Sequence, residues 1–240
     1  MLLHGKKSVL RAEFSPPIQL KDSSEIALLS LVTWNSIPNV DSSNCNFYYN
    51  DGKTDHVIKL PTGSYEIDSI QDYLRDYMKL THSKNPLTDD EKLILGNHPI
   101  ILIGNRQTLK SEIVCRYTVD FEQPNNIAKI LGFDAKTIQP FVRTESKFPV
   151  NILNVQVIKL HCNLSEGSFD NNSPVHTLHS FYPDVPPGYK IVEIPKSLIY
   201  YALNTRLISE IEIKITDQNQ NLLNFRGESI FVRLHIRKCP

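Results

Sequence analysis

The sequence predicts an all-β fold, a single jelly-roll β-sandwich of two antiparallel sheets with about eight core strands, one or two short helices and long loops. Segments that alternate apolar and polar residues recur from residue 26 to residue 237, and such alternation is typical of half-buried strands. Fifteen prolines stand against nine glycines, which favours long ordered loops and strand edges. No internal repeat and no break in composition divides the 240 residues, so one continuous domain is expected.

Residues 1–20 are expected to form an N-terminal arm outside this domain. Their apolar side chains follow no sustained period, and Pro16-Pro17 closes the segment. The jelly-roll domain is therefore expected to span residues 21–240.

The first elements of the domain are expected to be a strand, a hairpin and a helix. Residues 26–34 are mostly apolar on both faces, which predicts a strand inside a sheet. The segment Asn50-Asp51-Gly52-Lys53 lies between the strand-forming residues 47–49 and 56–60, and Asp-Gly is a strong hairpin signal. A stripe at helical spacing then predicts a helix whose apolar face consists of Ile67, Ile70, Tyr73, Leu74, Tyr77 and Met78.

The middle of the chain predicts two strands and a short helix. Residues 100–103 are expected to be a short buried strand. Residues 109–121 predict a longer strand whose inward side chains are Ile113, Cys115, Tyr117, Val119 and Phe121. Residues 124–132 predict a helix that Asn125 or Asn126 caps and Gly132 ends.

The last part of the chain predicts strands separated by a long loop. Residues 150–164 predict a strand whose apolar parity changes at Val157-Ile158, as at a β-bulge. Residues 165–187 are expected to be an extended loop, and residues 191–194 and 198–203 short strands. The chain is expected to end in an antiparallel pair across the polar turn 217–228, with one apolar face formed by Ile211, Ile213, Ile215, Ile230, Val232, Leu234 and Ile236.

Charge and composition exclude several classes of protein. Lys plus Arg and Asp plus Glu are 26 each, and a formal charge of zero argues against a non-specific nucleic-acid binder and against strong attraction to an anionic membrane. No segment has the roughly 20 apolar residues of a membrane span. The cysteines form no CxxC motif and no secretion signal precedes them, so we expect reduced thiols in a protein made inside the cell.

Signatures of catalysis are missing from the sequence, which contains no GxSxG, GxxxxGK[ST], GxGxxG or HExxH. We therefore expect no enzyme activity, no cofactor and no metal site. The close pair His176 and His179 lies in a predicted loop without an obvious third ligand, which favours loop or interface histidines over metal ligands. His161 and Cys162 are neighbours on a predicted strand, so their side chains point to opposite faces and do not form a catalytic pair.

Several short segments of the sequence resemble those of a known protein family. They are LSLVTWNSIPNV (residues 29–40), LPTGSYEI (60–67), LGF (131–133), VPPGYKIVEIP (185–195) and NFRGE (224–228). In this order they resemble the capsid proteins of Polinton (Maverick) elements and the related adintoviruses, over residues 27–237. The polar stretch 83–98 departs from the family pattern and is expected to be a local insertion.

The resemblance implies a structural capsid protein. This family has a large double jelly-roll protein that forms hexon-like trimers and a smaller single jelly-roll protein that forms penton-like pentamers at the vertices of an icosahedral shell. At 240 residues the chain is short for two jelly rolls, so the resemblance implies the penton, or minor capsid, protein. It brings no catalytic residues with it.

The expected partners are copies of the chain itself, as a pentamer or alternatively a trimer, and the major capsid protein of the same element. No specific nucleic acid and no membrane are expected. The expected location is the virion, assembled in the nucleus or cytoplasm of the host cell. Aromatic residues and arginine are enriched in protein interfaces, and the candidate subunit-contact residues are Phe181, Tyr182, Tyr200, Tyr201, Arg226 and Arg233.

Other functions stay open at this point. One is a jelly-roll recognition module for a glycan or receptor, with an aromatic shelf formed by Tyr48, Tyr49, Tyr200 and Tyr201. Another is a domesticated host protein or a trimeric, hexon-like capsid fragment. The outward charged residues Glu212, Lys214, Arg233 and His235 are expected either in a solvated surface or in a subunit contact.

Overall fold

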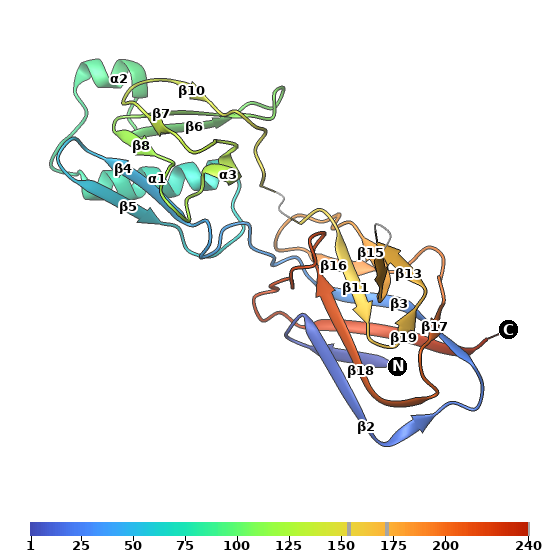
Figure 1. Cartoon of the computed structure of the whole chain (residues 1–240). Helices are drawn as coiled ribbons and strands as arrows, with labels where there is room; N and C mark the ends of the chain where they lie inside the picture. Colours follow the sequence, from blue (N-terminus) through green and yellow to red (C-terminus); the bar gives the residue numbers. More distant parts are fainter. Residues whose placement is uncertain (153–154, 171–172, 240) are drawn as a thin grey trace. The chain divides into compact units, whose positions relative to one another are not determined.

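The computed structural model describes residues 1–152, 155–170 and 173–239. It contains two compact units, one formed by Met1–Ile37 with Val155–Pro240 and the other by Pro38–Asn154 (Figure 1). We call them the sandwich unit and the inserted unit, because the second interrupts the sequence of the first. Both consist mainly of antiparallel strands with a few short helices, so the predicted all-β class is confirmed.

The strands of the sandwich unit come from both ends of the chain. Their bounds are β1 Leu2–Gly5, β2 Val9–Gln19, β3 Ser24–Trp34, β11 Ile158–Cys162, β12 Ser165–Glu166, β13 Ser168–Asp170, β14 Ser173–Val175, β15 Thr177–Phe181, β16 Lys190–Glu193, β17 Tyr201–Leu203, β18 Leu207–Thr216 and β19 Ile230–Lys238. One sheet has the order β1-β19-β3-β17-β12, with β16 also paired to β3, and we call it the β3 sheet. The β18 sheet has the order β15-β11-β18-β2, and β13 and β14 form a separate hairpin.

A common apolar core holds the β3 and β18 sheets face to face. Ile26 and Leu28 of β3 and Val232 of β19 meet Leu160 of β11 and Ile213 of β18 in one cluster, each at most 2% exposed. Complete burial of such a side chain stabilises the fold by about 1.5–3 kcal/mol. The predicted two-sheet sandwich is therefore confirmed for this unit.

The expected pairing at the end of the chain is wrong, although the expected faces are right. β18 pairs with β11 and β2, while β19 pairs with β3 and β1. The two strands thus belong to different sheets, and their apolar faces oppose each other across the core. Alternation fixes which face of a strand is buried, but it does not fix the neighbouring strand.

The N-terminal residues are strands, not the expected arm. Leu3 of β1 lies opposite Val232 of β19, and Leu10 of β2 lies opposite Ile213 of β18. Leu3 and Leu10 are each 3% exposed, so this segment completes the edge of each sheet and adds to the core.

The segment 165–187, expected to be a loop, contains the short strands β12 to β15. Residues 153–154 of the strand expected over residues 150–164 lie outside the described residues, and β11 begins at Ile158, next to the predicted change of parity. Its shift in register against β15 lies between Leu160 and His161.

The inserted unit has its own elements. Their bounds are β4 Asn46–Asn50, β5 Asp55–Lys59, α1 Ile67–Thr81, α2 Asp89–Leu95, β6 Ile100–Gly104, β7 Ser111–Cys115, β8 Thr118–Asp120, α3 Ala128–Leu131, β9 Thr137–Ile138 and β10 Thr144–Glu145. One sheet has the order β5-β4-β8-β9 and another the order β10-β7-β6. The strand expected over residues 109–121 is split into β7 and β8, which lie in different sheets.

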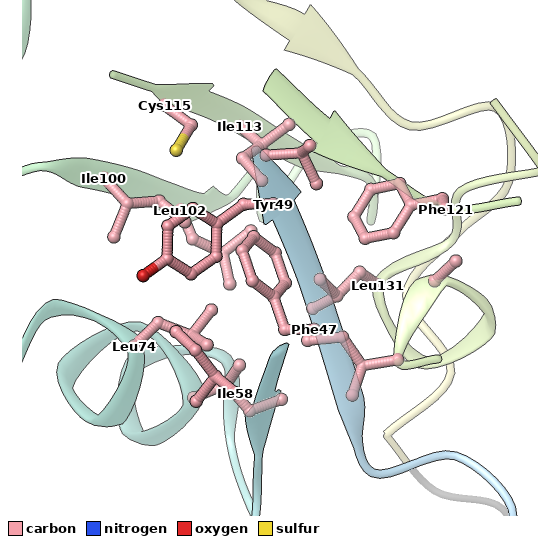
Figure 2. Packing of buried hydrophobic residues seen from close by; sticks show 14 of the residues in the cluster. Phe47, Tyr49, Ile58, Leu74, Ile100, Leu102, Ile113, Cys115, Phe121 and Leu131 are labelled. Atoms are coloured by element: carbon pink, nitrogen blue, oxygen red, sulfur yellow. The ribbon is translucent and has the colours of Figure 1, made fainter. Parts of the chain in front are cut away.

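The inserted unit also has its own core. Figure 2 shows Phe47 and Tyr49 of β4 packed among side chains from β6, β7 and α1. Ile70, Leu74 and Met78 form the buried stripe of α1, as predicted, whereas Tyr77 is 41% exposed. The chain was expected to form one jelly-roll domain over residues 21–240, and it forms two units with separate cores. Both units alternate apolar and polar residues alike, so composition does not mark the boundary between them.

Local signals fix the ends of the helices in this unit. Gly132 has φ +80° and closes α3, as predicted. The N-cap residue of α3 is Ile127, so the expected cap at Asn125 or Asn126 is wrong, although Asn126 Oδ1 accepts a hydrogen bond from the backbone N–H of Ala128. The polar stretch 83–98 contains α2, whose first turn is closed by a capping box of Thr88 and Glu91.

Candidate assembly surface

The outer face of the β3 sheet carries a row of apolar side chains. On β19, Val232 and Leu234 point to the core, so Phe231 between Ile230 and Val232 points outward and is 43% exposed. Phe231 lies opposite Val32 of β3, which in turn lies opposite Val192 of β16. Side chains in register on one face touch their neighbours, so the row is continuous over three strands.

Two further exposed side chains extend this row. Leu2 of β1 and Trp34 of β3 line the same surface depression as Val32 and Phe231. We define the outer patch as Leu2, Val32, Trp34, Val192 and Phe231. Cationic residues border it, because Arg233 is opposite Leu2 and Lys190 is opposite Trp34. An apolar centre with a charged rim is the usual composition of a protein interface.

The outer face of the β18 sheet is different, because charged groups there pair with one another. The carboxylate of Glu212 binds Arg11 and lies 3.0 Å from Lys214 Nζ. The hydrogen bond from Lys214, together with Arg11, lowers the pKa of Glu212 below its ordinary value. His161 on the same face lies 2.9 Å from the hydroxyl oxygen of Thr216. The charged groups on this face already have partners and are compatible with water. The outer patch is therefore the better candidate for a contact with another molecule.

A second cluster on the β3 sheet is polar and centres on Tyr200, which directly precedes β17. The Tyr200 hydroxyl lies 2.8 Å from Nδ1 of His235, and the guanidinium of Arg237 lies 3.5 Å from the centre of the Tyr200 ring. Arg237 also binds the carboxylate of Glu25. The cluster holds Tyr200 in place through a cation–π contact and a hydrogen bond.

The other predicted contact residues have different surroundings. Phe181 is 7% exposed and belongs to the core, and Tyr201 packs against the core half-buried. Tyr182, directly after β15, is 75% exposed. Arg226 is exposed at a turn, and Arg233 borders the outer patch. Tyr182 and Arg233 are thus available to a second molecule, whereas the side chains of Phe181 and Tyr201 serve the fold.

The histidine pair considered in the sequence is not brought together. His176 Nδ1 lies 2.6 Å from the carbonyl oxygen of Ser165, and His179 Nε2 lies 2.8 Å from Glu193 Oε1. His161 and Cys162 point to opposite faces, and Cys162 is fully buried. Tyr49, one residue of the possible aromatic shelf, is 2% exposed and cannot offer its ring to a glycan.

Sequence reasoning missed the outer patch. A signal was present, since Phe231 and Val192 are apolar at positions where the alternation expects polar residues. These residues form one continuous surface only because the strand register places Phe231, Val32 and Val192 side by side.

No helix in the described ranges has both the length and the apolar character needed to cross a membrane. No known protein family matches the sequence, and neither does any curated protein. A solved structure does match: the crystal structure of the selenomethionine-labelled mavirus penton protein, with a TM-score of 0.51 and 8% identity. The match covers 98% of this chain and 92% of the other. The fold of this chain is therefore similar to that of a viral penton protein.

Proposed function

We propose that this chain is a structural capsid subunit that assembles with copies of itself, as a penton-like minor capsid protein. The observation that carries the proposal is the outer patch, an exposed apolar surface on a sandwich whose other outer face is charged and internally paired. The likeness in fold to the mavirus penton protein supports the same function. We propose no catalytic role for any residue of the chain.

A closed ring of identical copies is made by heterologous contacts, in which one surface meets a different surface of the next copy. The outer patch supplies the first surface. Exposed aromatic side chains on the β13–β15 side supply the second, since Phe169 is 73% exposed and Tyr182 is 75% exposed. We propose a pentamer, in which Tyr182 and Arg233 lie in or beside the contact between neighbours.

The resemblance of short sequence segments supports a more specific proposal. We propose that the chain belongs to a Polinton (Maverick) or adintovirus-like element and that its location is the virion. In that setting its second partner is the major capsid protein of the same element, at the vertices of the shell.

The test is the mass of the full chain in solution, measured by native mass spectrometry and sedimentation over a range of concentrations. We expect a species five times the 27.5 kDa of the chain. Phe231→Asp and Val192→Asp place a carboxylate in the outer patch, and each is expected to weaken association by about tenfold or more. Leu93→Asp is the matched control, because Leu93 is 87% exposed on α2 and lies outside the outer patch.

Other outcomes separate the rival functions. A species of three copies would replace the pentamer with the trimeric, hexon-like alternative. A wild-type chain that stays monomeric at every concentration, or a Leu93→Asp variant that dissociates as much as Phe231→Asp, would contradict the proposed contact. Binding to a glycan array without self-association would favour the recognition module.

A further inference from the structure

The inserted unit holds a cluster of possible metal ligands that is independent of the outer patch. Asp51 and His56 belong to the β4–β5 hairpin, and His82 follows the last residue of α1. Each offers one ligand atom, and the three atoms lie within 4.8 Å of one another. Such a group of His, Cys, Asp and Glu side chains occurs at this one place among the described residues.

The hairpin fixes the carboxylate of Asp51 and leaves one oxygen for a ligand. Asp51 Oδ1 accepts hydrogen bonds of 2.9 Å from the backbone N–H groups of Lys53 and Thr54. Asp51 Oδ2 lies 3.1 Å from Nε2 of His56. The hydrogen bonds from Thr54 and Lys53, helped by His56, lower the pKa of Asp51 far below its ordinary value, so the carboxylate is ionised at neutral pH.

Aromatic contacts fix the two imidazole rings. The Tyr49 ring is stacked on His56 with centroids 4.8 Å apart, and the Tyr49 hydroxyl lies 3.0 Å from Nε2 of His82. Both rings are thereby held beside the Asp51 carboxylate, with the ligand atoms of the three residues within 4.8 Å of one another.

The surroundings favour a cation. His82 is at the C-terminal end of α1, the negative end of the helix dipole. The positive charge of Arg116 acts on His82, but Arg116 Nε lies 2.9 Å from the carboxylate of Glu91, which offsets that charge. Asp51, His56 and His82 are all partly exposed, so an ion reaches them from solvent.

We propose that Asp51, His56 and His82 form a binding site for a divalent transition metal such as Zn²⁺. Two imidazole nitrogens and one carboxylate oxygen suit this class of ion, and a three-ligand zinc site keeps a fourth position for water. Asp51 Oδ2 and His56 Nε2 are already 3.1 Å apart, close to the separation of neighbouring ligand atoms in a tetrahedral site with bonds of about 2.0–2.2 Å. The ion would then join the β4–β5 hairpin to the end of α1 and stabilise the inserted unit.

The experiment uses the full chain, freed of metal with a chelator and titrated with Co²⁺ and then Zn²⁺. We expect one Co²⁺ per chain with the visible absorption of a four-coordinate ion, displaced by Zn²⁺. Zn²⁺ is also expected to raise the melting temperature, because it binds the folded state in preference to the unfolded state.

His56→Gln and His82→Gln are each expected to weaken binding by at least about tenfold. His98→Gln is the control, since His98 lies in the same unit but outside the cluster. Asp51→Asn keeps the oxygen that accepts the hairpin hydrogen bonds and removes the charge, so it tests the site even if a histidine variant fails to fold. Absence of a Co²⁺ spectrum in the wild type, or equal affinity in Asp51→Asn and the wild type, would overturn the proposal.

Discussion

The carbonyl oxygen of Gly132 accepts a hydrogen bond of 2.9 Å from the backbone N–H of Phe148. A β-carbon on Gly132 would collide with the backbone of Phe148, and Gly132 also has φ +80°, a conformation that L side chains rarely adopt. The end of α3 and the segment after β10 are thus held together at a position that only glycine fits.

Gly132→Ala is therefore expected to destabilise the inserted unit by about 2–4 kcal/mol, from backbone strain and the clash together. Gly52→Ala is the control, because Gly52 has φ +89° but no atom within 4 Å of its ideal β-carbon. We expect that variant to lose about 1 kcal/mol, from strain alone. Chemical unfolding measures both, and equal losses would refute the role of the contact with Phe148.

A second prediction concerns the core of the sandwich unit. Ile213 of β18 is fully buried between the two sheets, so Ile213→Ala is expected to cost about 2–5 kcal/mol in the free energy of unfolding. Ile194 is 64% exposed, and Ile194→Ala is expected to change the free energy of unfolding by less than about 0.5 kcal/mol. Urea denaturation compares the two variants; similar losses would show that β18 does not face the β3 sheet across a core.

The separate cores predict separate unfolding. Calorimetry of the full chain is expected to show two transitions, since each unit has its own sheets and its own core cluster among the described residues. Ile213→Ala is expected to lower one transition and Gly132→Ala the other. A single transition that both substitutions lower alike would contradict this.

The ion pair of Arg116 and Glu91 predicts that the stability of the fold depends on pH. Burial raises the pKa of Glu91, but hydrogen bonds from Thr88 and Arg116 outweigh it and hold the pKa below the ordinary 4.5. A carboxyl group whose pKa is lowered by folding stabilises the fold above its unfolded pKa, and this contribution is lost as the pH falls through the folded pKa.

Glu91→Gln keeps a hydrogen-bond acceptor but has no charge. The variant is expected to be less stable than the wild type at neutral pH, and the difference is expected to shrink as the pH falls below 4.5. Unfolding free energies at a series of pH values measure this difference. If it stays constant with pH, the charge of Glu91 has no part in holding α2.

The outer patch and the group of Asp51, His56 and His82 are two features that sequence reasoning does not find. The apolar character of Phe231 and Val192 is visible in the sequence, but their meeting through Val32 depends on strand register. The sequence predicts Asp51 and His56 only as parts of a hairpin. His82 joins them because α1 ends beside that hairpin, and no local pattern encodes this proximity.

The sequence by itself determined the local features: the mostly β class, the buried faces of β18 and β19, the stripe of α1 and the glycine that ends α3. These follow from side-chain periodicity and backbone geometry, which act over a few residues. Only the tertiary structure decided that β18 and β19 lie in opposite sheets, that residues 1–20 form edge strands, and that Pro38–Asn154 is a separate unit. The alternation of apolar and polar residues determines which face of a strand is buried. Which element covers that face depends on packing and hydrogen bonding over the whole chain.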